Sequence, residues 1–353
     1  MIKRLLNTKV LILSGAFMFL SVSGSAQAAL DWSYCDANGN VAIQDINIKG
    51  GRYYPGDELQ RVTVPVSYTC HTSFKTYGPD YRATLNLYSL GNLVKIFKDN
   101  GLGMDIIAQE GNQTPVTFTW KEIQEGFSGW SSSKVFGQWM DQNKTYTQSG
   151  TLTFRIFVYQ VFTSNFRNVD IPVNTLNILP YEPSSYGPPT VPFKPLTMSA
   201  FNLRFIPDNS GKVIVSPSVL RMGRFYTEYK ETMVAREIPF TVTAQQNIGT
   251  DTPFITPLAI EFQTNGLTLA DDDSSVTLKN TKGEANGFKL SVMSESGVPV
   301  KFNIKADMGS ISLDNGSGGR IIKQYRAKVE PIPGAVIKTG NFSAAMTVIV
   351  TYI

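Results

Sequence analysis

The sequence predicts an all-β protein made of two β-sandwich domains in tandem. Apolar residues alternate with polar ones along most of the 353 residues, helical periodicity is scarce, and a proline-rich segment separates two halves of similar length. Alternation marks a strand with one buried face, and short strands separated by Gly, Asn, Asp and Pro are typical of sandwiches. At roughly 150 residues per domain, the length also fits two domains.

Residues 1–28 have the pattern of a secretory signal peptide. A basic start precedes an apolar stretch over 10–20, and Ala26 and Ala28 form an A-x-A cleavage pattern. We expect cleavage after Ala28. The apolar stretch is shorter than the ~20 residues that a membrane-spanning helix needs. The mature protein is therefore expected to be exported.

The composition argues against several functional classes. The formal net charge is +4, but Lys3, Arg4 and Lys9 lie in the signal segment, so the mature chain carries 4 − 3 = +1. A nucleic-acid-binding protein would need a strongly basic surface. One histidine and two cysteines cannot supply a zinc site of several His or Cys ligands. We therefore expect no nucleic-acid partner, no metal and no other cofactor.

The two cysteines, Cys35 and Cys70, are expected to form a disulfide, because export permits one and no other pairing exists. Closing this loop should contribute about 3 kcal/mol through the unfolded chain. A redox role is not favoured, because the C-x-x-C spacing that tunes a thiolate is missing.

Alternating runs place the predicted strands in chain order. Helical periodicity is scarce, and the only candidate for a helix is short, around 90–100 or 121–126. The strands are expected at 62–68, 116–120, 152–158, 238–242, 258–262, 288–292, 300–304 and 342–352.

The segment 180–195 breaks the pattern with six prolines. Proline removes ladder donors and stiffens an extended chain, so the segment is interpreted as an interdomain linker. The predicted organisation is then a first domain over 29–182, a linker over 183–195 and a second domain over 196–353.

The end of the chain carries the most specific signal. Gly340 is the fourteenth residue from the end, the penultimate residue is aromatic, and apolar residues alternate between them. The segment Tyr325–Val329 and a turn through Pro331 precede it. The predicted edge strand comprises Gly340, Phe342, Ala344, Met346, Val348, Val350, Tyr352 and Ile353. This combination resembles the C-terminal signature of chaperone–usher fimbrial subunits, and the resemblance covers roughly residues 200–353.

The resemblance implies two immunoglobulin-like β-sandwich domains, the second an incomplete pilin fold that lacks its last strand. Such a domain exposes a hydrophobic groove and accepts a donor strand. The donor is a periplasmic chaperone at first and the adjacent fimbrial subunit later, with assembly at an outer-membrane usher. The Ile353 carboxylate would be captured by basic residues of the chaperone. Many pilin domains carry their own disulfide, and this half has no cysteine.

Only residues 29–34 precede Cys35 in the mature chain, too few to form a donor strand. The subunit is therefore expected to accept a strand without giving one, and so to end the fibre. It resembles a two-domain tip adhesin, with an N-terminal receptor-binding, lectin-like domain for a host glycan or host surface protein. The expected location is the fimbrial tip on the cell surface. Two alternatives are a cap or adaptor subunit without a receptor and an exported carbohydrate-active enzyme.

Sugar recognition needs an aromatic face and a few rigid hydrogen-bonding groups, which gather on loops. The segment 127–146 combines these features, and GGRYYPGDE at 50–58 is a second candidate. The tryptophans could instead be core anchors, and both segments could be simple turns. The candidate receptor-binding residues are Trp130, Trp139, Asp141, Gln142, Asn143, Tyr53 and Tyr54.

No catalytic site is predicted. His71 is the only imidazole, and no G-x-S-x-G element is present. The three aspartates at 271–273 lack the ligand spacing of a calcium loop and are interpreted as a solvated hairpin turn. The chain is not expected to be an enzyme.

Overall fold

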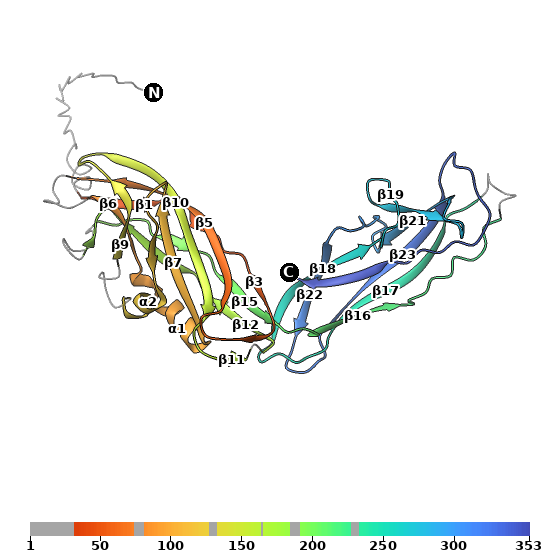
Figure 1. Ribbon diagram of the computed structural model, residues 1–353, viewed down its shortest axis with the longest axis horizontal. Helices are drawn as coiled ribbons and strands as arrows, with labels where there is room; N and C mark the ends of the chain where they lie inside the picture. The colour runs from red at the N-terminus through yellow and green to blue at the C-terminus, as the bar shows by residue number, and fades with distance from the viewer. Residues whose placement is uncertain (1–31, 74–80, 127–132, 164, 184–190, 227–232) are drawn as a thin grey trace, which may run out of the picture.

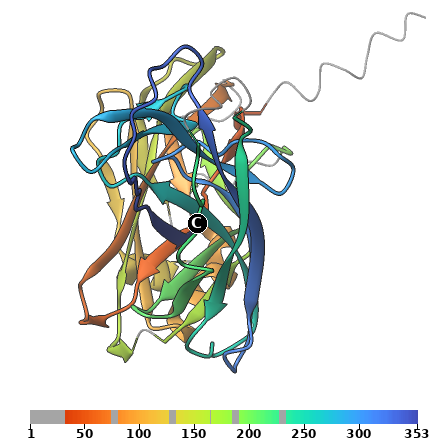
Figure 2. The same ribbon diagram turned by 90° about the vertical axis from the view of Figure 1, so that its right-hand side faces the viewer.

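The computed structural model describes residues 32–73, 81–126, 133–163, 165–183, 191–226 and 233–353. Over these residues the protein is all-β, as predicted, with two sandwich bodies placed end to end (Figure 1). Figure 2 views the second body from its free end, with the first behind it. The predicted signal peptide 1–28 lies outside the described residues. No helix within the described ranges is long and apolar enough to cross a membrane.

The elements of the first body include two short α-helices, which fall where the alternation stops. Its strands and helices are β1 (Tyr34–Ala37), β2 (Asn40–Val41), β3 (Ile46–Lys49), β4 (Arg52–Tyr53), β5 (Glu58–His71), β6 (Arg82–Asn86), the 3₁₀ helix η2 (Tyr88–Leu90), α1 (Gly91–Asp99), β7 (Leu102–Glu110), β8 (Val116–Phe118), α2 (Trp120–Gly126), β9 (Ser133–Trp139), β10 (Thr145–Val158), β11 (Phe162–Thr163), β12 (Arg167–Ile171), β13 (Asn174–Leu179), β14 (Leu196–Met198) and β15 (Phe201–Ile206).

The second body contains strands only among its described residues. They are β16 (Gly211–Ser216), β17 (Arg236–Gln246), β18 (Phe254–Gln263), β19 (Leu269–Ala270), β20 (Ser275–Lys279), β21 (Ala285–Ser294), β22 (Ala306–Leu313), β23 (Arg320–Pro331) and β24 (Thr347–Tyr352). The predicted strand at 300–304 is wrong. Those residues form a turn between β21 and β22, in which Phe302 is nonetheless buried in the core.

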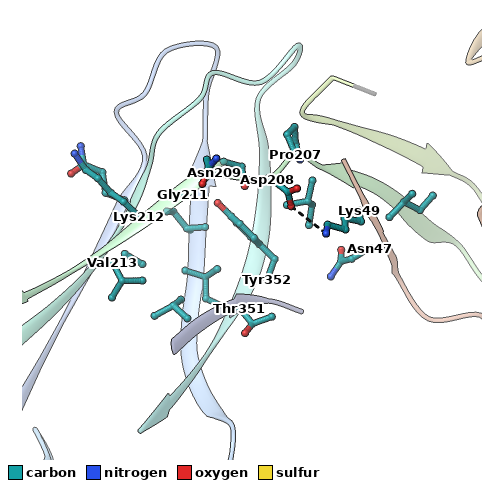
Figure 3. Close-up of a pocket in the computed structure, with 18 residues that line it drawn as sticks. Asn47, Lys49, Pro207, Asp208, Asn209, Gly211, Lys212, Val213, Thr351 and Tyr352 are labelled. Carbon is teal, nitrogen blue, oxygen red and sulfur yellow. Dashed lines mark ion pairs between the residues drawn. The ribbon is translucent and has the colours of Figure 1, made fainter. Parts of the chain in front are cut away.

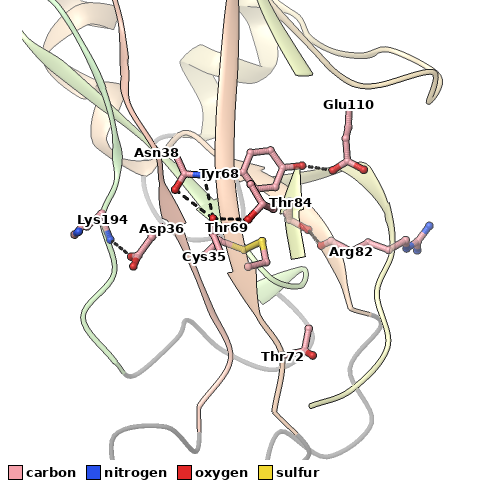
Figure 4. Close-up of a disulfide and its surroundings, with 12 residues drawn as sticks. Cys35, Asp36, Asn38, Tyr68, Thr69, Thr72, Arg82, Thr84, Glu110 and Lys194 are labelled. Atoms are coloured by element: carbon pink, nitrogen blue, oxygen red, sulfur yellow. Dashed lines mark hydrogen bonds between the residues drawn. A yellow bond between two sulfur atoms is a disulfide. The ribbon is translucent and has the colours of Figure 1, made fainter. Parts of the chain in front are cut away.

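The first domain is built around the long antiparallel pair β5 and β10, which lie in the sheet β1-β5-β10-β7-β8. Their inward residues alternate with outward polar ones, as the sequence predicts. Cys35 on β1 lies opposite Cys70 on β5, and the two form the predicted disulfide with a Cα–Cα distance of 4.0 Å (Figure 4). The other large sheet has the order β2-β14-β13-β6-β9.

The boundary between the domains lies later in the chain than predicted. β14 pairs with β13 and β2, and β15 pairs with β12 and β3, so both belong to sheets of the first domain. Leu203 and Phe205 on β15 are fully buried in the first core. The predicted start of the second domain at 196 is therefore wrong, and that domain begins with β16. Proline-rich composition marks extended chain but does not show which core the following strands join. Part of the predicted linker, 184–190, lies outside the described residues.

Helices form at both of the places between which the sequence left the choice open, as α1 and α2, and both contact β7 of the first sheet. Thr119 and Glu122 form a capping box at the start of α2, in which the Thr119 N–H donates to the Glu122 carboxylate at 2.8 Å. Trp120 is only 3% exposed. Its ring lies 6.1 Å from that of Phe97 on α1. This tryptophan is a core anchor of the first domain.

The second domain pairs a larger sheet, β16-β17-β23-β21-β20-β19, with a smaller one, β22-β18-β24. Buried apolar residues of β17, β18, β22 and β23 fill the space between the sheets. β16 stands at the edge of the larger sheet and β24 at the edge of the smaller one. The C-terminus lies where the two bodies meet (Figure 1).

Candidate functional site

The first candidate site is the strand gap, which we define as the space between the edge strands β16 and β24. Each has a ladder partner on one side only within the described sheets, β17 for β16 and β18 for β24. The two edges belong to opposite sheets of the same sandwich. Their unpaired main-chain N–H and C=O groups can therefore take a further strand.

Apolar side chains of both edge strands point into the strand gap without being enclosed by it. The ladder places Val213 opposite Ala244 and Val350 opposite Ile260, and both partners are buried core residues. Yet Val213 is 38% exposed, and no residue of β24 is fully buried. The core of the second domain is thus left uncovered along this gap.

At the domain junction the strand gap opens into a cleft of about 420 Å³ (Figure 3). Tyr352 points from β24 toward Gly211 on β16, where an added Cβ would lie 3.0 Å from the Tyr352 hydroxyl. Burial raises the pKa of the Tyr352 phenol. Lys49 and Asp208 form an exposed ion pair at the rim, with Nζ and Oδ1 3.7 Å apart.

An aromatic cluster joins the segments that flank the two edge strands. Phe342 stacks on Phe288 with ring centroids 6.0 Å apart and lies 6.1 Å from Phe225. Phe225 follows β16 in the chain and Phe342 precedes β24, so the two flanking segments meet at Phe288 of the larger sheet.

Only the second half of the predicted C-terminal edge strand forms a strand, and the prediction of a strand over its first half is wrong. Val348, Val350 and Tyr352 lie on β24 and face the core, whereas 340–346 is not part of a strand. β24 begins at Thr347 because its partner β18 ends opposite it, at Gln263. The preceding residues cross to the larger sheet, where Phe342 makes an isolated bridge with Asn280. Gly340 and Ala344 are exposed there, while Met346 packs against the core.

The second candidate site is the distal turn, which we define as residues 139–144, from the last residue of β9 to the residue before β10. Trp139 is 60% exposed, so it is not a core anchor. The main chain next to Trp139 is held by Glu110. The buried Glu110 carboxylate accepts hydrogen bonds from the N–H of the neighbouring Gln138 at 2.9 Å and from the Tyr68 hydroxyl. An exposed indole thus stands on a rigid support.

The loop that follows Trp139 is held by Thr72. The Thr72 hydroxyl donates to the Asp141 carbonyl oxygen at 2.6 Å and accepts from the Lys144 N–H at 3.0 Å. The Asp141 carboxylate pairs with Lys144 Nζ at 2.7 Å, which lowers the pKa of Asp141 and raises that of Lys144. Gln142 and Asn143 are exposed between them, and Asn143 has a left-handed φ of 55°. The turn presents a charge pair and two amides in a defined conformation.

The remaining predicted receptor residues do not join the distal turn. Trp130 lies outside the described residues. Tyr53 and Tyr54 lie at the opposite end of the first domain, where the Tyr53 hydroxyl donates to the Lys49 carbonyl oxygen. Burial, with the nearby Asp57 charge, raises the pKa of Tyr53. β5 has 14 residues, so the two ends are separated by about 43 Å.

The other singled-out groups have structural roles. His71 Nδ1 lies 2.9 Å from the Thr145 hydroxyl, and its ring packs on Tyr34. The aspartates 271–273 form the turn between β19 and β20, as predicted, and all three have positive φ. Asp271 pairs with Lys289 at 2.8 Å. No group of three or more metal-ligating side chains occurs in the part of the chain that the structure describes.

Two residues that sequence reasoning missed lie at the domain junction. Phe166 sits in the core of the second domain although it precedes β12 of the first. Arg204, a buried cation on β15, contacts the end of β24. Neither stands out in the sequence, since each belongs to an ordinary alternating run or its flank.

No family model and no curated protein matches the sequence. The similar solved structures include the CupB6 tip adhesin from Pseudomonas aeruginosa, which is 13% identical over 91% of this chain and 95% of that chain, with a TM-score of 0.30. CfaE, the adhesive subunit of CFA/I fimbria of enterotoxigenic Escherichia coli, is 10% identical over 90% and 94%, with a TM-score of 0.29. The P pilus rod subunit PapA is 16% identical over 41% of this chain and 99% of that chain, with a TM-score of 0.30. At these identities and TM-scores the likeness carries no functional argument of its own.

Proposed function

We propose that this chain is a fimbrial tip adhesin of the chaperone–usher type. The second domain takes up a β-strand from a partner in the strand gap, first from a periplasmic chaperone and then from an adjacent subunit. The first domain binds a host glycan or a host surface protein. The chain is not an enzyme, and its place of action is the cell surface after export.

The observation that carries the proposal is the strand gap itself. Among the described strands, β16 and β24 each have a ladder partner on one edge only, and inward residues such as Val213 and Val350 remain partly exposed above a buried core. A long apolar edge of this kind invites association with other chains, and proteins normally cover it. An added strand would supply both main-chain hydrogen bonds and apolar side chains for the gap.

The experiment joins a strand to the full mature chain. A segment of about ten alternating Val and Thr residues, long enough to follow the edge, is attached behind Ile353 through a flexible Gly/Ser linker. We expect the urea midpoint of the second domain to rise and binding of a hydrophobic dye to fall.

The matched control carries the same residues in two blocks, all Val and then all Thr, so that the period of two is lost. It should not stabilise the domain, because only alternation places every apolar side chain on the inner face. Equal stabilisation by both segments, or by neither, would contradict strand uptake in the gap.

Receptor binding is supported by the distal turn. Trp139, Asp141 and Gln142 are exposed on a rigid support, at the end of the first domain farthest from the junction. An indole face and fixed polar groups are what a sugar ring needs. At the end of a fibre this surface would face outward.

The test is binding of the full mature chain to a glycan array and to host cells. We expect Trp139→Ala to fold normally and to bind less. Tyr54→Ala, with a side chain 58% exposed at the opposite end, should bind as the unaltered chain does. Absence of any ligand, together with adhesion that does not depend on this chain, would favour a cap or adaptor subunit.

A further inference from the structure

The first domain inserts a phenylalanine into the core of the second. Phe166 is only 2% exposed, and its ring meets Phe254 at 5.6 Å and Tyr352 at 6.0 Å. The Asp251 N–H donates to the Phe166 carbonyl oxygen at 3.0 Å. The aromatic side chain that ends β24 is therefore packed against a residue of the other domain.

The first domain also holds the main chain of the same strand. Arg204 Nη1 donates to the main-chain oxygen of Ile353 at 3.0 Å, and Nη2 contacts the Asp45 carboxylate. Asp45 is itself fixed by the Asn202 N–H at 2.8 Å. The Arg204 side chain is buried, so this is a desolvated, charge-assisted contact of the stronger kind.

A third part of the first domain borders the strand gap. Asn47, Ile48 and Lys49 of β3 line the cleft into which the gap opens, opposite Gly211 and Thr351 (Figure 3). β3 pairs with β15, the strand that carries Arg204. One rigid edge of the first domain therefore supplies both the contact to β24 and the side of the cleft.

We propose that the strand-accepting site is built by both domains. Arg204 and Phe166 are positioning residues that hold β24 as a wall of the strand gap, and β3 closes its junction end. The end of a donor strand that fills the gap then contacts the first domain. Any partner that binds Ile353 must first break its contact with Arg204. The identity of the occupant rests on the proposed function, whereas the positioning of β24 does not.

The physical reason lies in the exposure of β24. Among the strands that the structure describes, its one ladder partner is β18, and its last rung is the Ile353 N–H donating to the Pro257 carbonyl oxygen at 3.1 Å. Strand ends with one partner open locally at low free-energy cost. Contacts to Tyr352 and Ile353 from the first domain oppose that opening at the point where it would start.

The test is hydrogen exchange of the β24 amides in the full mature chain. Arg204→Gln and Phe166→Leu should each speed exchange of the rungs near Ile353 by about tenfold or more, as expected for losing a hydrogen bond to a charged group or a buried aromatic contact. Exchange in the central strand β23 should not change. Arg204→Lys, which keeps the cation, should restore part of the protection.

The control variant is Tyr54→Ala, which lies at the same end of the first domain but away from β24. It should leave β24 exchange unchanged. If β24 exchange is unaltered in both Arg204→Gln and Phe166→Leu, the first domain does not position the strand and the inference fails. If Arg204→Gln unfolds the first domain, Phe166→Leu and Arg204→Lys still decide the question.

The tethered alternating strand separates this inference from the proposed function. In the unaltered chain it should stabilise the second domain, and in Phe166→Leu it should stabilise that domain less. Failure to stabilise the unaltered chain would contradict strand uptake, but the exchange experiment would still test whether the first domain positions β24. Equal stabilisation in both chains would show that the gap does not need the first domain, and would overturn the two-domain site.

Discussion

The two domains share the same alternation of apolar residues, but the inward residues are fully covered in the first domain and only partly covered along β24 of the second. In the first domain, the inward residues of β5 and β10 are covered by a facing sheet, and Tyr68, Phe154 and Val158 have almost no exposed surface. In the second, Val348, Val350 and Tyr352 alternate just as regularly but are only half-buried. The difference shows that alternation sets which face of a strand is apolar, whereas the neighbouring strands decide whether that face is covered.

A closed core and an open one should respond differently to the same kind of change. In a closed core each lost methyl group leaves a cavity, whereas at an open edge solvent or a partner fills the space.

The largest contrast is between two tryptophans of the first domain. Trp120→Ala should cost about 3–5 kcal/mol of unfolding free energy, because the ring is enclosed between Phe97 and Tyr159. Trp139→Ala should change stability by less than about 0.5 kcal/mol, because the side chain is largely in solvent. Urea unfolding followed by circular dichroism measures both. A comparable loss in Trp139→Ala would make Trp139 part of the core and remove it from the proposed receptor site.

The second contrast concerns the disulfide. Replacing both Cys35 and Cys70 by Ala should lower the stability of the first domain by about 3 kcal/mol, since the bond closes a loop with a sequence separation of 35. The second domain should keep its urea midpoint. Both cysteines lie in the first domain. The urea transition of the first domain should therefore shift to lower urea, while that of the second domain stays in place. An equal shift of both transitions would mean that they unfold as one unit.

The third contrast is a matched pair of valines on inward positions. Val66→Ala on β5 should cost about 2 kcal/mol, whereas Val350→Ala on β24 should cost less than about 1 kcal/mol in the free chain. When the tethered alternating strand fills the gap, the cost of Val350→Ala should rise toward that of Val66→Ala. An unchanged cost would argue that the strand does not enclose Val350.

The smallest effect is a pH dependence confined to the first domain. The hydrogen bond from Lys134, together with the N–H of Thr119, lowers the pKa of Glu122 from 4.5 to about 2. The unfolded chain therefore binds the proton more readily, and the contribution of Glu122 is present above about pH 4.5 and lost as the pH falls toward 2. Because this carboxylate is partly exposed, we expect less than about 1 kcal/mol. Glu122→Gln should unfold more easily than the unaltered chain at pH 6 but not at pH 2. An equal difference in unfolding free energy between the two chains at pH 6 and pH 2 would contradict this role of Glu122.

Several features were predictable because they depend on local chemistry. The disulfide followed from the expectation of export and from having only two cysteines. The places of α1 and α2 were indicated by the little helical periodicity that the sequence has, and the turn at 271–273 by three adjacent aspartates, which tolerate a left-handed φ better than most residues. Each of these requires no knowledge of how distant segments meet.

Other features depend on contacts between segments that are distant in the sequence, and these were predicted wrongly. β14 and β15 resemble the start of a second domain, yet their partners β2 and β3 lie more than a hundred residues earlier in the chain. The apolar pattern of 340–346 suggests a strand, but the ladder of β18 ends at Gln263, and within the described residues Phe342 makes only an isolated bridge, with Asn280. The candidate residues Tyr53 and Trp139 proved to lie at opposite ends of one domain, because β5 and β10 are long.

By itself, the order of residues determined the strand period, the apolar face of each strand and the covalent link between Cys35 and Cys70. These are properties of single segments, governed by side-chain alternation and by the chemistry of two thiols. That β16 and β24 form the facing edges of the two described sheets, and that Arg204 reaches Ile353, follows from the packing of the sheets, because both depend on which distant segments that packing brings together.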